Sequence, residues 1–253
     1  MDPAAAASMS KTGERDGGVD EVAVELPLEI RLNGEPVAVT MRTPGHDFEL
    51  AAGFLYGEGI VDGPPEVTLP EDLPANTVDV LAPGAVPPPG RRFYTTSSCG
   101  ICGKGALEEV ESIAPRVEGG PSIERGLLAV LPDRLSQPAF ERTGGLHATG
   151  LFDAAGEALL VREDVGRHNA MDKVIGRVLL DGALPLTDRI LCVSGRLAFE
   201  LVQKTARAGA PILVGVGAPT SLAVELADDR GITLAGFARR GSVNVYTHAQ
   251  RVT

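Results

Sequence analysis

The sequence contains no tryptophan, and aromatic residues make up only 4% of its 253 positions. It has just three cysteines, too few and odd in number for a disulfide framework, so we expect free thiols that react or bind a metal. The net charge of -11 argues against general affinity for nucleic acid, which rests on clustered cations. No partner of that class is expected.

Long apolar runs are also missing. None approaches the roughly 20 residues that span a bilayer, and residues 1–18 hold no apolar core of the kind found in a signal peptide. We therefore expect a cytoplasmic protein with no membrane partner. Hydrophobic residues nevertheless make up 43% of the chain, enough for a sizeable core.

The first half of the chain predicts a small β-rich region. Residues 1–20 indicate a disordered tail. Apolar and polar residues then alternate over Val22–Ile30 and Pro36–Met41 around an Asn-Gly turn, which predicts a β-hairpin. Helical spacing follows over 46–55, and the Pro- and Gly-rich stretch 63–90 predicts mostly loop.

The second half alternates strand and helix patterns, which predicts an α/β fold with a mixed sheet and helices on both faces, in three layers. Apolar runs expected in the sheet are Leu146–Phe152, Ala158–Arg162, Arg189–Val193, Pro211–Val216, Thr233–Gly236 and Val243–Thr247. The expected helices are Asn169–Leu180, Ala198–Ala208 and Ser221–Arg230.

Two of the three cysteines, Cys99 and Cys102, lie in the glycine-rich segment TTSSCGICGKG. A thioredoxin-like redox motif is one interpretation, although its usual aromatic surroundings are absent. A structural zinc site would need two more ligands, and the histidines and Cys192 are scattered singly. A zinc deaminase would need a His-x-Glu sequence, which does not occur, and proline before Cys99, where Ser98 stands. Inert cysteines are a fourth alternative.

A nucleophilic or sulfur-carrying thiol fits this segment best. Cys99 precedes an expected helix over 106–113, whose N-terminal N–H groups would stabilise a thiolate, and Lys104 adds a cation. The glycines predict that the loop 95–105 is mobile and leaves the thiol uncovered. Cys192 lies in an apolar strand and is predicted to be a core residue.

Three strand-to-helix turns are predicted at one edge of the sheet, where ligands bind in open α/β folds. They are Glu163–Asn169, which contains Arg167 and His168, then Ser194-Gly195-Arg196, then Gly215–Ser221. Their helix N-termini suit an anion. An alternative for the first turn is a helix cap with a solvated charge cluster.

The late segment Phe237-Ala238-Arg239-Arg240-Gly241-Ser242 offers a ring to stack on a base, two guanidinium groups for phosphate and a backbone that a ligand can approach. The alternative is an exposed β-turn between closing strands.

Four motifs in this order resemble the FdhD family. They are Ser98–Lys104, the run Arg162–Lys173 with its EDVGRHNA core, Ser194–Arg196, and Val245-Tyr246-Thr247-His248. The resemblance extends over residues 22–252. It implies a sulfurtransferase that takes sulfur from a cysteine desulfurase as a persulfide and passes it to a molybdenum or tungsten bis-guanine-dinucleotide cofactor, the bis-molybdopterin guanine dinucleotide, before that cofactor enters formate dehydrogenase.

The resemblance also implies roles for particular residues. Cys99 would carry the persulfide, Cys102 would be auxiliary, and Phe237–Ser242 would bind the cofactor, with GDP as a mimic. Contacts from Arg167, His168 and Ser194–Arg196 are inferred from their place at the sheet edge alone. No structural metal is expected.

Three regions follow from the family, and a homodimer is expected. They are the tail 1–20, an N-terminal FdhD domain 21–140, and a cytidine deaminase-like C-terminal domain 141–253. The rival function is a chaperone that binds the guanine nucleotide cofactor without moving sulfur.

Overall fold

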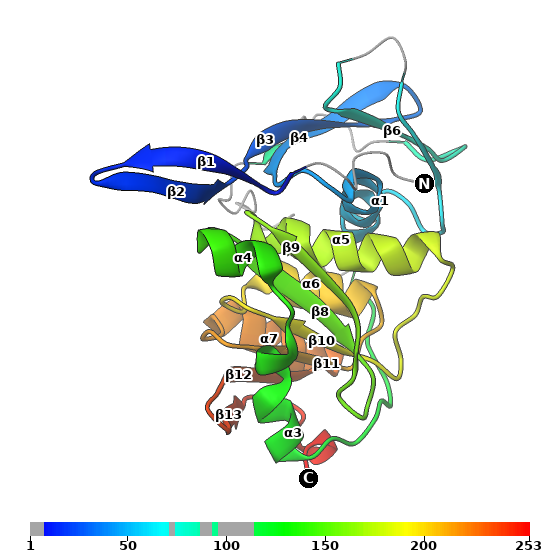
Figure 1. Ribbon diagram of the computed structural model, residues 1–253. Helices are drawn as coiled ribbons and strands as arrows, with labels where there is room; N and C mark the ends of the chain where they lie inside the picture. The colour runs from blue at the N-terminus through cyan, green and yellow to red at the C-terminus, as the bar shows by residue number, and fades with distance from the viewer. Residues whose placement is uncertain (1–7, 71–73, 87–92, 96–113) are drawn as a thin grey trace. The chain divides into compact units, whose positions relative to one another are not determined.

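The computed structural model describes residues 8–70, 74–86, 93–95 and 114–253 (Figure 1). The chain forms two compact units, and each takes up more than one stretch of sequence. The first contains the described residues from 8 to 95 together with Pro138–Leu146 and Glu163–Gly182. The second contains residues 114–137, His147–Arg162 and Ala183–Thr253.

A five-stranded sheet forms the centre of the first unit. Its hairpin turns at Asn33 and Gly34, whose φ angles of 51° and 85° suit these two residues better than any others. The predicted hairpin is therefore present. The strand order is β5-β6-β3-β4-β7, with β3 antiparallel to β4, and with β6 and β7 parallel to β3 and β4 respectively. The strands are β3 Leu26–Leu32, β4 Glu35–Arg42, β5 Glu66–Thr68, β6 Thr77–Leu81 and β7 Phe93–Thr95.

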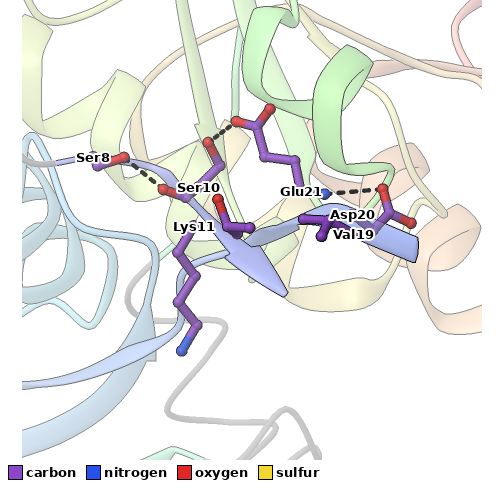
Figure 2. A pocket seen from close by; sticks show the side chains of 7 residues that line it. Ser8, Ser10, Lys11, Val19, Asp20 and Glu21 are labelled. Atoms are coloured by element: carbon purple, nitrogen blue, oxygen red, sulfur yellow. Dashed lines mark hydrogen bonds between the residues drawn. The ribbon is translucent and has the colours of Figure 1, made fainter. Parts of the chain in front are cut away.

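The predicted tail needs correction, because residues 10–23 form a hairpin of β1 (Ser10–Arg15) and β2 (Gly18–Ala23). An Asp-Gly turn at Gly17, with φ 83°, reverses the chain and is a hairpin signal that the polar composition obscured. A hydrogen bond between side chains joins its two strands. In the shallow recess of Figure 2 the Ser10 hydroxyl donates to the Glu21 carboxylate.

Glu21 also ties this hairpin to α4 (Pro138–Thr143), since Arg142 Nε lies 2.9 Å from Glu21 Oε1. The Ser10 hydroxyl and then Arg142 lower the pKa of the Glu21 carboxyl.

Two helices of the first unit pack at unusually short range. They are α1 (Asp47–Gly57) and α5 (Arg167–Leu180). A Cβ at Gly53 would lie 1.9 Å from the Asp172 carbonyl oxygen, and a Cβ at Gly176 would lie 1.8 Å from the Glu49 carbonyl oxygen. Only glycine at both positions permits this contact between backbones.

Replacing Gly53 by alanine should therefore destabilise the protein by about 3 kcal/mol, because neither helix can withdraw without opening the core. Urea unfolding of the Gly53→Ala protein measures this cost. Gly126→Ala is the matched control, because Gly126 is also helical and nothing lies within 4 Å of its added Cβ. The control should be neutral or slightly stabilising. Equal effects of the two changes would contradict the packing argument.

The second unit has a six-stranded sheet in the order β13-β12-β11-β10-β8-β9. Strands β10, β11 and β12 are parallel, while β8 and β13 run antiparallel to their neighbours β10 and β12. The strands are β8 His147–Phe152, β9 Ala158–Asp164, β10 Ile190–Val193, β11 Ile212–Gly215, β12 Thr233–Arg239 and β13 Ser242–Val245. The last two residues of β9, Glu163 and Asp164, group with the first unit.

Helices cover both faces of this sheet (Figure 1). On one face α3 (Arg125–Val130) and the 3-10 helix η2 (Leu131–Arg134) pack on Ile190, Cys192 and Val214. The alternating residues of these strands point to the other face. There α6 (Phe199–Arg207) and α7 (Ser221–Arg230) connect the parallel strands, because successive right-handed crossovers in one direction lie on one face. A last 3-10 helix, η3, covers Ala249–Arg251.

The predicted mixed α/β architecture is confirmed. The units differ from the predicted contiguous ranges 21–140 and 141–253. Residues 114–137, with α3 and η2, group with the second unit, while α4, the turn before α5 and α5 group with the first. The glycine contact between α1 and α5 accounts for this placement of α5. Among the helices of the described ranges, none is long and apolar enough to span a membrane.

Candidate functional site

The cysteine loop itself lies outside the described residues, and with it Cys99, Cys102, Lys104 and the helix expected over 106–113. The strand that leads to this loop is described. Thr95, the last residue of β7, is in register with Thr40 of the parallel strand β4. β7 and β4 therefore run in the same direction, and β4 leads into the turn around Thr43.

The EDVGRHNA segment begins with two buried carboxylates that face inward. Glu163 accepts hydrogen bonds from the backbone N–H groups of Ala139 (3.1 Å) and Phe140 (2.7 Å), and so holds the first turn of α4. Asp164 is fully buried. Its carboxylate accepts from the backbone N–H groups of Thr43, at 3.1 Å, and Gly166, at 2.8 Å.

Lys173 completes the neutralisation of Asp164. Its Nζ lies 2.7 Å from Asp164 Oδ2, and both side chains are fully excluded from solvent. The ammonium also donates to the carbonyl oxygens of Thr43 (2.9 Å) and Glu163 (3.3 Å). Its three donors thus have three acceptors, which is the condition under which a buried charge is tolerated.

Asn169 extends this network to β4. Its Nδ2 donates to Asp164 Oδ1 at 3.0 Å and to the Met41 carbonyl at 2.8 Å, and the Thr40 hydroxyl donates to its Oδ1 at 3.4 Å. We call Thr43, Asp164, Asn169 and Lys173 the Asp164 clasp. The clasp fixes the start of α5 to β4, the strand beside the one from which the cysteine loop departs.

The sequence predicts an anion-binding turn at Glu163–Asn169. Its two carboxylates, however, bind groups of the protein itself, so the acidic part of this turn has a structural role. Arg167 and His168 occupy the first two positions of α5 and are half-buried. They belong to the first unit, whereas Ser194–Arg196 and Phe237–Ser242 belong to the second. A shared ligand for both sets stays a prediction.

Breaking the Asp164–Lys173 pair should strongly lower the stability of the protein. Asp164→Asn leaves a buried ammonium without its counter-charge, and we expect a loss of about 3–5 kcal/mol in the free energy of unfolding. Asp181→Asn is the matched control, since Asp181 pairs with Arg177 of α5 at 2.7 Å with both side chains about half exposed.

The control should lose less than about 1 kcal/mol. Urea unfolding of both variants measures the two losses, and the double replacement Asp164→Leu with Lys173→Met should lose less than Asp164→Asn alone. A loss at Asp164 no larger than at Asp181 would contradict the role of the clasp.

In the second unit, the turns after β10 and β11 are joined by their backbones. Gly217 donates to the Gly195 carbonyl at 3.1 Å, Leu197 donates to Ala218 at 3.1 Å, and Thr220 donates to Leu197 at 3.1 Å. A Cβ at Gly217 would lie 2.8 Å from the Arg196 Cα, so this contact requires glycine. Two of the three predicted turns therefore lie side by side.

The segment Phe237–Ser242 joins the same edge. The Phe237 N–H donates to the Gly217 carbonyl at 3.1 Å. Phe237 has a φ of 54°, rare for a bulky side chain, at an irregularity between Gly236 and Arg239 in the pairing of β12 with β13. The structure thus brings together Ser194–Arg196, Gly215–Ser221 and Phe237–Ser242.

The side chains of this edge differ in what they can do. Arg196, Arg239 and Arg240 are exposed and can meet an anion, and the Arg239 guanidinium lies 5.9 Å from the centre of the Phe237 ring. Ala238 is fully buried and belongs to the core. The Ser194 hydroxyl accepts from the Ala148 N–H at 2.9 Å, so it also serves the sheet.

The VYTH motif lies at the end of the sheet, where the sequence predicts a closing strand over Val243–Thr247 and the structure has β13. Thr247 Oγ1 accepts from the Leu234 N–H (3.0 Å) and donates to the Ile232 carbonyl (2.6 Å). His248 Nε2 lies 2.8 Å from the Asp228 carbonyl.

Sequence reasoning missed Thr43, whose N–H donates to Asp164, whose hydroxyl accepts from the Val165 N–H and whose carbonyl accepts from Lys173. No local signal marks such a residue, since its partners lie more than a hundred positions later.

Within the described ranges, no group of three or more His, Cys, Asp or Glu side chains could hold a metal ion. Cys192 is fully buried in β10, as predicted, and burial raises the pKa of its thiol far above the usual range. That thiol is inert at neutral pH.

A model of the FdhD/NarQ family matches residues 23–253. The chain belongs to this family. Proteins named sulfur carrier protein FdhD are 51% identical in Streptomyces avermitilis, 50% in Mycobacterium tuberculosis and 44% in Sulfolobus acidocaldarius. These matches cover 94%, 92% and 97% of this chain and 92%, 92% and 96% of those proteins.

A solved structure is also similar. The crystal structure of a candidate formate dehydrogenase accessory protein from Desulfotalea psychrophila matches with a TM-score of 0.74 and 28% identity, over 96% of this chain and 97% of that one. The family match begins at residue 23, so most of the β1–β2 hairpin lies outside it. The clasp and the edge of the second unit's sheet lie within it.

Proposed function

We propose that this protein is a sulfur carrier required for formate dehydrogenase activity. It takes sulfur from a cysteine desulfurase in the cytoplasm, holds it as a persulfide on Cys99, and delivers it to the molybdenum bis-molybdopterin guanine dinucleotide cofactor. The observation that carries this proposal is the match over nearly the whole chain to proteins named sulfur carrier protein FdhD, in a sequence that holds the Cys99-x-x-Cys102 pair.

The chemistry starts with the Cys99 thiolate. It attacks the outer sulfur of the desulfurase persulfide, the S–S bond of the donor breaks, and the donor cysteine leaves as a thiolate. In release, the Cys102 thiolate attacks the inner sulfur of the Cys99 persulfide. A Cys99–Cys102 disulfide forms, hydrosulfide leaves toward the acceptor, and a cellular thiol later reduces the disulfide.

The described part of the first unit supports a charged environment for this thiol. Cys99 lies four residues beyond Thr95 in the sequence. Thr95 is in register with Thr40, which contacts Asn169 in the first turn of α5. The strand before the cysteine segment thus neighbours a strand that contacts the N-terminus of α5, which carries Arg167 and His168 and whose backbone N–H groups favour an anion.

The acceptor would bind at the edge of the sheet in the second unit. Arg196, Arg239 and Arg240 are exposed there, and guanidinium groups bind phosphate with two parallel hydrogen bonds. The exposed backbone at Gly241 lets a phosphate approach closely. GDP, which carries the guanosine and two of the phosphates of the cofactor, is the simplest probe of this site.

Loading with a desulfurase and cysteine tests the sulfur carrier. Cys99→Ala should eliminate the cyanide-labile sulfur and the persulfide mass, whereas Cys102→Ala should keep a measurable part. Cys192→Ala is the control and should load like the unaltered protein, because Cys192 is buried and its thiol protonated. Mass spectrometry of the intact proteins and of the Cys99 peptide reads the result.

Full loading of the Cys99→Ala protein would contradict the assignment. GDP binding without any persulfide on Cys99 would indicate the alternative, a chaperone that binds the nucleotide cofactor and moves no sulfur.

A further inference from the structure

Tyr246 lies directly after β13 and is exposed to solvent. Its side chain is 39% exposed, although its backbone is held in the sheet by a 2.8 Å hydrogen bond from its N–H to the Leu234 carbonyl. Tyr56, by comparison, is only 8% exposed in the core of the first unit. An exposed ring on a fixed backbone is available for contact with a planar ligand.

The ring of Tyr246 packs against Gly236. A Cβ at Gly236 would lie 3.3 Å from Tyr246 Cε2, 3.1 Å from Pro219 Cδ and 3.0 Å from the Gly217 carbonyl oxygen. The ring, the proline and the Gly217 carbonyl therefore surround Gly236, and a Cβ there would be in tighter than ordinary contact with all three.

This place adjoins the proposed phosphate-binding edge. Phe237 follows Gly236 and donates to the same Gly217 carbonyl, and the turn ends at Thr220, whose hydroxyl accepts from the Ala223 N–H at the start of α7. A nucleotide whose phosphates bind at Phe237–Ser242 would therefore lie close to Tyr246, which adjoins Gly217 and Gly236.

Phe237 is the other aromatic residue at this edge, and its ring already contacts Arg239. The Arg239 guanidinium lies 5.9 Å from its centre, within the range of a cation–π contact, and the Phe237 side chain is only half exposed. The ring of Phe237 thus positions Arg239, and no such contact involves Tyr246 among the described residues.

We propose that Tyr246 is the residue that stacks on the base of the nucleotide, while Phe237 orients Arg239 toward the phosphates. This inference rests on the proposed function of the same edge and goes beyond it by assigning base recognition to a residue outside Phe237–Ser242. Stacking accepts any flat base, so Tyr246 contributes affinity for the nucleoside part and none for the phosphates.

Calorimetric titration with two probes, GDP and inorganic pyrophosphate, tests this assignment. Tyr246→Leu should weaken GDP binding about 5- to 150-fold, the range that loss of one aromatic stack produces, and leave pyrophosphate binding unchanged. Tyr246→Phe retains the ring and should bind GDP within about twofold of the unaltered protein. Arg240→Ala should weaken both probes, because phosphate contacts are common to them.

Leu159→Ala is the control for an exposed apolar side chain, since Leu159 is 51% exposed on β9, the opposite edge strand of the sheet. It should change neither affinity, and circular dichroism checks that every variant is folded.

The outcomes separate this inference from the proposed function. GDP binding that Arg240→Ala weakens and Tyr246→Leu does not would overturn the role of Tyr246 and leave the site in place. Equal losses of GDP and pyrophosphate in Tyr246→Leu would also overturn it, because stacking acts on the base alone. An unaltered protein that binds neither probe would overturn the nucleotide site and the stacking residue together.

Discussion

The buried ion pair of Asp164 and Lys173 is the interaction on which the first unit depends. It joins the end of β9, the first turns of α5 and the backbone at Thr43, and Asp164 meets Thr43 across 121 positions of sequence. A pair excluded from water contributes little net stability against an apolar substitute, but removal of one partner is expensive. Its value is therefore positional: with Asn169 it holds the start of α5 against β4, whose neighbour β7 leads to the cysteine loop.

Close contact between backbones is the second constraint, and both units achieve it with glycine. Gly53 and Gly176 bring α1 and α5 together, while Gly217 and Gly236 bring together the turns at the edge of the second sheet. These four glycines have no positive φ, so they are required for space and not for backbone conformation. In the sequence alone, a glycine at these positions suggests local backbone flexibility. In the structure a Cβ at Gly53, Gly176 or Gly217 would lie less than 3.0 Å from a backbone atom.

Local sequence patterns predict much of the fold correctly. Helix α7 at Ser221–Arg230 has the bounds that periodicity and turn residues predict, because it depends on its own sequence. The role of Glu163–Asn169 could not be found in this way. Two carboxylates before a helix look solvated until Lys173 and Thr43 are placed beside Asp164. The β1–β2 hairpin was missed for a different reason, since its polar composition outweighed a correct Asp-Gly turn signal.

The strained backbone of Phe237 explains how the edge of the second unit presents its arginines. A left-handed φ at a bulky residue costs on the order of 1–3 kcal/mol and persists only where the surroundings enforce it. Here the Gly217 carbonyl holds the Phe237 N–H, and Ala238 is anchored in the core. The irregularity shifts the register between Gly236 and Arg239, so Ala238 keeps its inward place while Arg239 and Arg240 stay exposed. In a regular strand Ala238 would lie on the same face as Gly236, opposite to Ala235. The irregularity instead places Ala235 and Ala238 in the same buried cluster. The strain thus serves to display two cations next to a buried residue, at the point where the proposed phosphates would lie.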